Sequence, residues 1–417
     1  MRNGEFRVHN KNFFKGLNDR KFKWSLKEDG IERTSGFINM GTVAPQEKKE
    51  FSIKLPTMDF SNGQEYLLKI SALNNDGDAL IPMGHQIAWE EFALNQISYN
   101  NEVENNGRFA DLKTYSSTDT LFIQGQNFLV ALHKYRGELL HYEVDGKSLL
   151  SKGMQPNFWR PPTDNDLGNG MHKWAEIWKD AGSMAISTFE ELLDVEPEVV
   201  TFKVRYDLHA MNNAKVWVTY SVRSDASIDI HYLYESRDEE LPKIPRVGLQ
   251  WELPDEFQFM QWYGKGPHET YWDRKSSGET GIWQGQVWEQ LHRYPRPQES
   301  GNKTEVRWMS LTNKNGQGLK VSTTSVPLSM SAWQLKMEEL DFVAGKKGAE
   351  SASGLVPVTS KHGADLIPGA VISWNIDLKQ MGLGGDTSWG RHVHDEYTLS
   401  EKKYDYSFRI TPVGFDN

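Results

Sequence analysis

Apolar and polar residues alternate along most of the chain, and this period of two is the feature that most limits its fold. Successive side chains of an extended strand point to opposite faces, so each alternating run predicts a strand with one buried face. The clearest runs are Phe22-Trp24-Leu26, Val216-Val218-Tyr220-Val222, Ile228-Ile230-Tyr232-Tyr234 and Ile372-Trp374-Ile376-Leu378. Polar residues such as Asp229, Asn375 and Asp377 occupy the opposite face. The pattern predicts half-buried strands and an all-β protein.

Turn-forming clusters separate these runs, as antiparallel sandwiches require. They are Glu28-Asp29-Gly30, Asn74-Asn75-Asp76-Gly77 and Thr312-Asn313-Lys314-Asn315-Gly316. One segment, residues 171–182, instead has a helical pattern, because Trp174, Ile177 and Trp178 follow the i, i+3, i+4 spacing and Gly182 stands at the end. A single short helix leaves the all-β assignment unchanged.

A polar, Asn-rich stretch from about residue 95 to 119 predicts a domain boundary, because it is too long and too polar for a hairpin loop. A chain of 417 residues is long enough for two or three domains. Residues 1–97 are expected to form an immunoglobulin-like β-sandwich of about seven short strands. Residues 118–417 are too many for one such sandwich and predict a wide structure of two sheets. The segment 342–366, rich in Gly, Ser and Lys, is interpreted as a mobile loop.

The charge balance narrows the range of partners. Lys and Arg total 47 and Asp and Glu total 57, for a net charge of −10. Nucleic acids and anionic membranes are bound by cationic surfaces, so neither is expected as a partner. There is no Cys, which excludes disulfides, thiolate nucleophiles and Cys-type zinc sites. A run of about 18 apolar residues, the signature of a transmembrane helix, does not occur either.

Four segments combine aromatic, Gly, Pro and charged residues at high density. They are FWRPPTDNDLG at 158–168, WYGKGPHETYWDRK at 262–275, YPRPQESGNKT at 294–304 and MGLGGDTSWG at 381–390. Flat aromatic rings beside Arg, Asp, Asn and Gln suit a sugar, because a pyranose has C–H faces for stacking and hydroxyls for hydrogen bonds. The alternative interpretation is structural: turns fixed by Pro and Gly, with aromatic rings closing the edge of a sandwich.

These four segments, in this order, resemble the C-terminal half of the large bacterial β-galactosidases of glycoside hydrolase family 2. The shared motifs are FWRPPTDND, GxGPxExYxDR from Gly264 to Arg274, RPQExGN from Arg296 to Asn302, and GGDxSW from Gly384 to Trp389. Residues 5–95 also resemble the immunoglobulin-like domain that precedes this half. The resemblance implies that the second domain is a β-supersandwich related to galactose mutarotases.

The resemblance also implies that the catalytic part lies elsewhere. Enzymes of this family carry both catalytic Glu residues in a TIM barrel upstream, so this chain is expected to contain no catalytic residue and to be inactive alone. Bound Mg and Na are likewise expected in that barrel, with no cofactor in this chain. The implied partners are the barrel, a galactoside substrate and further copies in an oligomer. Any export signal would precede Met1 in the parent protein, so a bacterial cytoplasmic or periplasmic location is expected.

One residue role carries over from the family. Trp389, the Trp of GGDxSW, is expected to reach the mouth of the active site and stack on the substrate. Asp164, Asn165 and Asp166 are weaker expected substrate contacts, because an Asp-Asn-Asp run after Pro-Pro-Thr is also a turn and helix-cap signal. A structural role is expected for Arg274, Arg296 and Glu299, as buried ion pairs that hold the loops in place.

Two further patterns are given structural interpretations. His392 and His394 have a spacing that suits a metal if the segment is a strand, but no second ligand cluster is evident, and we predict no metal site. The pairs Glu90-Glu91, Glu190-Glu191, Glu239-Glu240 and Glu338-Glu339 are interpreted as solvated surface. Adjacent strand residues point to opposite faces, so one pair cannot flank a glycosidic bond.

Three functions remain open from the sequence. The leading one is the non-catalytic C-terminal portion of a β-galactosidase, completing the cleft that hydrolyses terminal β-D-galactosides such as lactose. The second is a separately encoded small subunit that activates a barrel-bearing partner. The third is an aldose 1-epimerase, which needs a His acid and a Glu base facing each other across a cleft.

Overall fold

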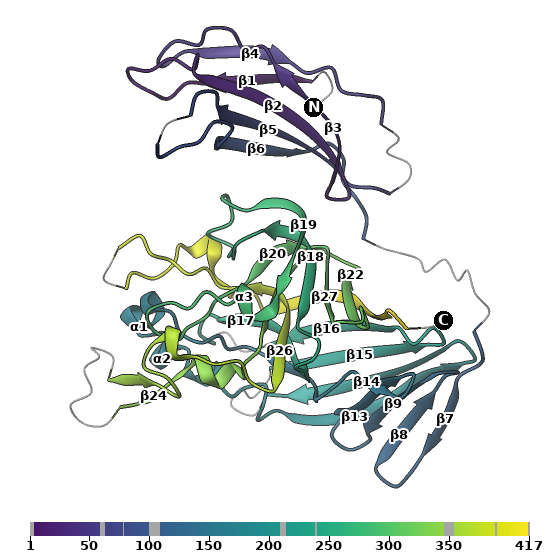
Figure 1. Ribbon diagram of the computed structural model, residues 1–417. Coiled ribbons are helices and arrows are strands. Elements are labelled where there is room, and N and C mark those ends of the chain that lie inside the picture. Colours follow the sequence, from purple (N-terminus) through teal and green to yellow (C-terminus); the bar gives the residue numbers. More distant parts are fainter. Residues whose placement is uncertain are drawn as a thin grey trace. The chain divides into compact units, whose positions relative to one another are not determined.

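The computed structural model of the chain, shown in Figure 1, is built almost entirely from β-sheets. It describes residues 4–58, 63–77, 79–99, 109–208, 214–237, 240–345, 354–387 and 390–415. Contacts between residues divide it into two compact units, Met1–Ser98 with Thr280–Ile282, and Tyr99–Glu279 with Trp283–Asn417. The predicted all-β class, a small sandwich followed by a much larger one, is confirmed.

The first unit contains two antiparallel sheets. One has the strand order β3-β2-β5-β6, and the other pairs β1 with β4. The strands are β1 Glu5–His9, β2 Arg20–Glu28, β3 Ile31–Ile38, β4 Lys48–Ser52, β5 Tyr66–Asn74 and β6 Gln86–Ala93. Two small cores hold these sheets together, one around Phe6 and Leu68 and the other around Phe22 and Val43. The described residues therefore form six strands, where the sequence predicted about seven.

The second unit begins with a five-stranded antiparallel meander. Its spatial order, β11-β10-β9-β8-β7, follows the chain because each strand pairs with the next one. The strands are β7 Lys113–Ser116, β8 Thr120–Gln124, β9 Phe128–His133, β10 Leu139–Val144 and β11 Lys147–Ser148.

A nine-stranded sheet forms the widest layer of the second unit, in the order β13-β14-β15-β16-β27-β22-β21-β18-β19. The strands are β13 Ile186–Glu196, β14 Val199–Asp207, β15 Lys215–Arg223, β16 Ile228–Glu235, β18 Phe259–Gly266, β19 Glu279–Gln286, β21 Trp308–Thr312, β22 Gly318–Thr323 and β27 Lys403–Val413. In β14, β15 and β16 every second side chain is buried. The alternation of apolar and polar residues over 216–234 predicted strands with one buried face, and the burial pattern confirms that prediction.

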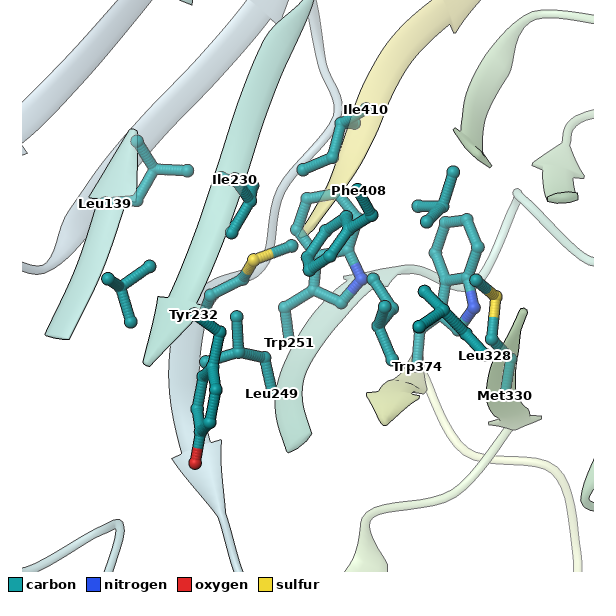
Figure 2. Close-up of a cluster of buried hydrophobic side chains, with 14 of the residues drawn as sticks. Leu139, Ile230, Tyr232, Leu249, Trp251, Leu328, Met330, Trp374, Phe408 and Ile410 are labelled. Atoms are coloured by element: carbon teal, nitrogen blue, oxygen red, sulfur yellow. The ribbon is translucent and has the colours of Figure 1, made fainter. Parts of the chain in front are cut away.

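A second five-stranded sheet, in the order β12-β17-β26-β23-β20, packs against the nine-stranded one. Its strands are β12 Lys152–Asn157, β17 Arg246–Pro254, β20 Lys303–Val306, β23 Leu328–Trp333 and β26 Val371–Gln380. Figure 2 shows the core between them, where Ile230 and Phe408 of the wide sheet meet Trp251 and Trp374 of the narrow one. The Trp251 and Trp374 rings lie 5.6 Å apart, centroid to centroid.

Strand β26 differs from its predicted half-buried form. Its apolar residues Ile372, Trp374 and Ile376 are buried as expected, but Asn375 and Asp377 on the opposite face have no exposed surface either. The prediction of a solvated polar face is therefore wrong for this strand. The reason is that these polar groups are paired inside the protein: Asn375 Oδ1 accepts from Arg246 at 2.8 Å, and Asp377 Oδ2 lies 3.3 Å from Arg246 Nε.

The helices are short and lie in the loops. They are α1 Asp164–Asn169, α2 Met171–Trp174, α3 Val287–Gln290 and the 3₁₀ turns η2 Glu176–Trp178, η3 Met337–Leu340, η4 Gly363–Asp365 and η5 Asp395–Tyr397. The helix predicted at 171–182 is thus only α2 and η2, because the backbone leaves helical geometry at Ala175. No helix among the described residues is long and apolar enough to cross a membrane.

The segment 342–366 was expected to be a loop throughout, and that prediction is wrong for the described residues. Strands β24 Phe342–Ala344 and β25 Leu355–Pro357 pair antiparallel within it. Residues 346–353 between these strands lie outside the described residues.

Candidate functional site

Each of the four motif segments adjoins a strand of the second unit, three of them in the five-stranded sheet that contains β26 and one in the nine-stranded sheet. Segment 158–168 follows β12, segment 262–275 leaves β18, segment 294–304 leads into β20, and segment 381–390 follows β26. Segments more than 100 residues apart in the chain are therefore joined by direct contacts. We call this set of loops the motif cluster.

Arg160 joins the first segment to the fourth. Its guanidinium is fully buried, pairs with Asp166 Oδ1 at 2.9 Å and donates to the backbone carbonyls of Met381 and Gly382. Asp166 is held in turn by Thr163, the N-cap of α1, whose hydroxyl and backbone N–H both bond its Oδ2. This reciprocal arrangement is a capping box, which satisfies backbone donors at the start of a helix.

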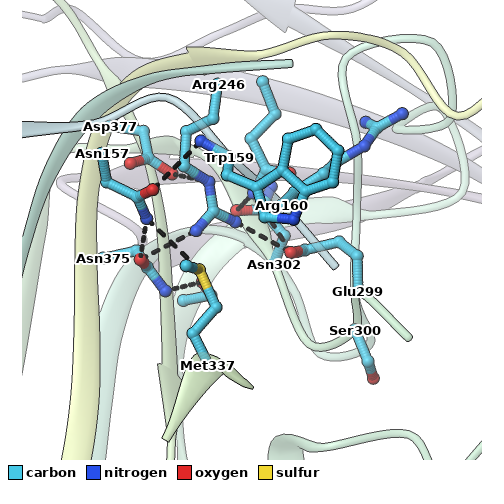
Figure 3. Close-up of polar contacts among 12 residues, drawn as sticks. Asn157, Trp159, Arg160, Arg246, Glu299, Ser300, Asn302, Met337, Asn375 and Asp377 are labelled. Atoms are coloured by element: carbon cyan, nitrogen blue, oxygen red, sulfur yellow. Dashed lines mark hydrogen bonds and ion pairs between the residues drawn. The ribbon is translucent and has the colours of Figure 1, made fainter. Parts of the chain in front are cut away.

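Arg246 of β17 forms the centre of a second buried set of contacts, shown in Figure 3. Its Nη2 lies 2.8 Å from Glu299 Oε2 and its Nε lies 3.3 Å from Asp377 Oδ2. Its Nη1 donates to Asn375 Oδ1 at 2.8 Å. Gln380 donates to the other oxygen of Glu299. The third segment is therefore fixed to the polar face of β26 through one arginine.

Burial changes the protonation of this set. Desolvation raises the pKa of Asp377 to about 8, against the opposing pull of Arg246. Burial raises the pKa of Glu299 as well, and Arg246 again acts in the opposite direction. The guanidinium of Arg160 also opposes the shift at Glu299, whereas Arg246 alone opposes it at Asp377.

Contacts of the second segment complete the motif cluster. Asp273 Oδ2 accepts from the backbone N–H of Gly384 at 2.8 Å, which ties this segment to the fourth. Glu269 pairs with Arg274 at 2.8 Å and accepts from the backbone N–H of Gly301, also at 2.8 Å. All four segments are thus connected by contacts between described residues.

The three residues predicted to contact the substrate, at positions 164–166, lie in different environments. Asp164 is exposed, pairs with Arg296 and faces Gln298. Asn165 is partly buried and donates to the carbonyl of Leu383 at 3.2 Å. Asp166 has no exposed surface and both of its oxygens are engaged, so the helix-cap interpretation holds for it and it is not available to a ligand.

Trp389, the principal predicted contact, lies outside the described residues. The segment resumes at Gly390, which lies against the backbone of α1. A Cβ atom at Gly390 would stand 2.2 Å from the carbonyl carbon of Gly168, and the φ of Gly390 is +77°. Only glycine fits such an approach and such a backbone angle. On the other side of Trp389, Leu383 is bonded to Asn165, so both flanks contact α1.

The three residues expected to form buried ion pairs divide into two kinds. Glu299 is fully buried and paired with Arg246, as predicted. Arg274 and Arg296 are also paired, but their side chains are 51% and 37% exposed, so the prediction of burial is wrong for them. Both arginines stand at the edge of the motif cluster, where their non-bonded donors face solvent.

The segment that carries His392 and His394 differs from the strand that the metal interpretation required. The segment is not a strand: His394 pairs with Asp386, and the His392 ring lies 5.7 Å from that of Trp174. Within the described part of the chain, no three His, Cys, Asp or Glu side chains are close enough to share an ion. The prediction that the acidic pairs lie on the solvated surface is wrong for Glu91. Its side chain is only 7% exposed and pairs with Lys27 at 3.1 Å.

Sequence reasoning missed Arg246 and the polar face of β26. Arg246 stands in the unremarkable run Pro245-Arg246-Val247, outside the four motifs. A usable signal was Asp377, a charged residue inside the otherwise strongly apolar strand of residues 371–378, because an acid at that place predicts a buried basic partner.

Comparisons with known proteins cover both units. The family model described as beta galactosidase small chain matches residues 124–410, and the one described as beta-galactosidase, domain 4 matches residues 6–95. A beta-galactosidase of Priestia megaterium is 30% identical over 417 residues, which are 98% of this chain and 38% of that protein. One from Halalkalibacterium halodurans is 28% identical, over 97% of this chain and 38% of its own length.

The chain thus spans about 38% of the length of these relatives. Among solved structures, a GalM/aldose epimerase homologue from C. elegans aligns with 74% of this chain, at 11% identity and a TM-score of 0.37.

Proposed function

The chain belongs to the β-galactosidase small-chain family, and from that membership we propose that it is the non-catalytic C-terminal portion of a β-galactosidase. The whole enzyme would hydrolyse terminal β-D-galactosides such as lactose. The observation that carries the proposal is the family match over 124–410, the region in which all four motif segments meet. In this role the chain completes the substrate cleft and supports assembly.

The chemistry is assigned to a barrel outside this chain. A retaining glycosidase needs two carboxyl groups about 5–5.5 Å apart, both able to reach the sugar. Glu299 and Asp377 are two carboxyl groups that share Arg246, but neither has any exposed surface. They hold loops and cannot touch a substrate. The two catalytic Glu residues, and the Mg and Na ions, are proposed to lie in the barrel.

The contribution of this chain to the reaction is proposed to be positioning. Trp389 would stack on the sugar, with Asp164 and Asn165 near it, because both flanks of Trp389 contact α1. Correct placement of a substrate lowers the barrier by removing freedom of orientation, and the effect is lost with displacements of about 1 Å. The buried arginines matter indirectly, since they fix the loops on which these groups stand.

The two other functions are not favoured. A separately encoded subunit has no support from the relatives reported above, which are longer proteins that contain this region. For an aldose 1-epimerase, the requirement is a His and a Glu facing each other across a cleft. The contacts of the motif cluster do not select such a pair.

The test is hydrolysis of a chromogenic β-galactoside in the presence of Mg²⁺. This chain alone should show no turnover even at high concentration, and adding the barrel-bearing portion should restore it. Turnover by the chain alone would contradict the assignment of the catalytic carboxylates to the barrel. Accelerated mutarotation of fresh α-D-galactose, followed by polarimetry, would instead favour the epimerase.

A further inference from the structure

A hollow of about 710 Å³ opens on the outer face of the nine-stranded sheet. Strands β18, β21 and β22 form its floor, and the end of β19 with the start of α3 forms one side. The other face of β21 and β22 is buried in the core, where it carries Met309, Leu311 and Val321. We call this surface the sheet hollow. Its described lining residues include none of those that the proposed function assigns to the substrate.

The strand register places two aromatic residues on opposite sides of a polar row. Gln261 of β18 pairs with Ser310 of β21, and Ser310 pairs with Lys320 of β22, so these three residues form the row. Phe259 precedes Gln261 by two residues and Trp308 precedes Ser310 by two, which keeps all of them on one face. Because β18 and β21 are antiparallel, Phe259 and Trp308 lie on opposite sides of the row. Their levels along the strands are four residues apart, which is about 13 Å.

The polar groups of the sheet hollow are not used by the fold. Gln261 of β18 and Gln284 of β19 are exposed, and their amides make no hydrogen bond with a described residue. The hydroxyl of Ser310 and the indole N–H of Trp308 have no partner in the described part of the chain either. Phe259 is a large apolar side chain, yet it is 40% exposed. The sheet hollow therefore offers aromatic surface beside unpaired donors and acceptors.

Charge is nearly absent from the lining. The described lining residues include one acid, Glu289, which accepts the backbone N–H of Gln286 at 3.0 Å in the capping box of α3. They include one cation, Lys320, whose ammonium lies 4.6 Å from the centroid of the Trp308 ring. The ring partly meets this charge, and burial lowers the pKa of Lys320. The lining therefore suits a neutral ligand better than a charged one.

We propose that the sheet hollow binds a neutral oligosaccharide, with Phe259 and Trp308 against its sugar rings and the amide of Gln261 bonding its hydroxyls. A pyranose has C–H faces that pack on aromatic rings, and its hydroxyls donate and accept as an amide does. One sugar ring cannot reach two aromatic residues about 13 Å apart along the strands, so the ligand has more than one ring. The volume lies within the usual range of small-molecule sites, about 300–1,000 Å³. This site is additional to the one proposed at Trp389.

The experiment measures binding of a linear tetrasaccharide of β-linked galactose to the intact chain by calorimetry. Trp308→Ala should weaken binding about tenfold, and Gln261→Ala, at an exposed position that leaves the fold intact, about fivefold. Gln124→Ala, at an exposed glutamine of β8 outside the sheet hollow, is the matched control and should bind like the unchanged chain. Trp389→Ala should also bind normally. Added salt should change the affinity little, because a neutral ligand forms no ion pair that salt could screen.

Other outcomes would overturn the proposal. No binding of the tetrasaccharide, or equal binding by the Gln261→Ala and Gln124→Ala variants, would show that the sugar does not use the sheet hollow. Binding that is lost in Trp389→Ala and kept in Gln261→Ala would assign the sugar to the site of the proposed function instead. Self-association that Phe259→Ala abolishes, seen by analytical ultracentrifugation without tetrasaccharide binding, would make the hollow a contact between copies. Activity is not measured here, so the proposed function is tested separately by the hydrolysis assay.

Discussion

Asp377 and Arg246 show how a single residue can determine the fold of a distant loop. Asp377 lies on β26 and is held 3.3 Å from Arg246, which also binds Glu299 of the third motif segment. All three side chains have no exposed surface. Removing one partner from such a set leaves an uncompensated buried charge, which is more damaging than the loss of an exposed ion pair.

The raised pKa of Asp377 predicts a pH-dependent stability. Its ordinary pKa is 3.8 and the folded value is about 8, so the folded state holds a proton that the unfolded chain releases between these values. The free energy of unfolding should therefore fall as pH rises from about 4 to 8, by up to about 1.4 kcal/mol for each pKa unit. Asp377→Asn, which stays neutral, should remove this part of the pH dependence in urea titrations at pH 5 to 9.

The difference between the two titration curves isolates Asp377, because all other groups are shared. The difference in the free energy of unfolding between the Asn variant and the unchanged protein should grow in favour of the Asn variant by up to about 1.4 kcal/mol for each pH unit between pH 5 and 8. Parallel curves would mean that Asp377 is ionised throughout and fully compensated by Arg246.

Trp389→Ala tests the proposed stacking ring in the assembled enzyme. Contacts of an aromatic ring contribute about 0.5–1.5 kcal/mol beyond burial of area, so kcat/KM should fall about tenfold. Trp389→Phe should retain most of the activity. The melting temperature should stay nearly unchanged in both, and Trp217→Ala on β15 is a control that should leave kcat/KM unaltered. A large fall in stability with Trp389→Ala would instead place the ring in the core.

At the scale of elements, strands were predictable wherever one face meets solvent. In β15 and β16 the alternation of residue types is the alternation of burial, because only one side of the wide sheet is covered. The burial of the polar face of β26 was not predictable, since its partner Arg246 lies on β17, which is remote in the chain. The predicted length of the helix at 171–182 was wrong for a related reason. The sequence pattern indicates an apolar face but does not indicate that the helix breaks at Ala175.

Helix α1 offers a test of how one element supports the cluster. Thr163 caps it, and Asp166 of the same capping box holds Arg160. Thr163→Ala should lower the free energy of unfolding by about 1 kcal/mol, while Thr163→Ser should keep the cap and the stability. Urea unfolding measures both. An equal loss in the Ser variant would show that the methyl group of Thr163, and not its hydroxyl, is responsible.

At the scale of the molecule, the sequence predicted the all-β architecture of a small sandwich followed by a much larger one. It did not predict which charged motif residues lie inside. Arg160 and Arg274 have the same side chain and both stand in motifs, yet the first is fully buried and the second is half exposed. The burial of a side chain depends on how the sheets pack against each other, and this packing cannot be deduced from a single sequence.

Removal of metal ions tests the division of labour between this chain and the barrel. No three His, Cys, Asp or Glu side chains gather around a common point in the described ranges, so chelation with EDTA should leave the melting temperature of this chain unchanged. The hydrolytic activity of the assembled enzyme should fall on the same treatment and return with Mg²⁺, because the proposed ions belong to the barrel. A lower melting temperature of the isolated chain after chelation would place a metal within it, and His392→Ala with His394→Ala would then show whether those two residues bind it.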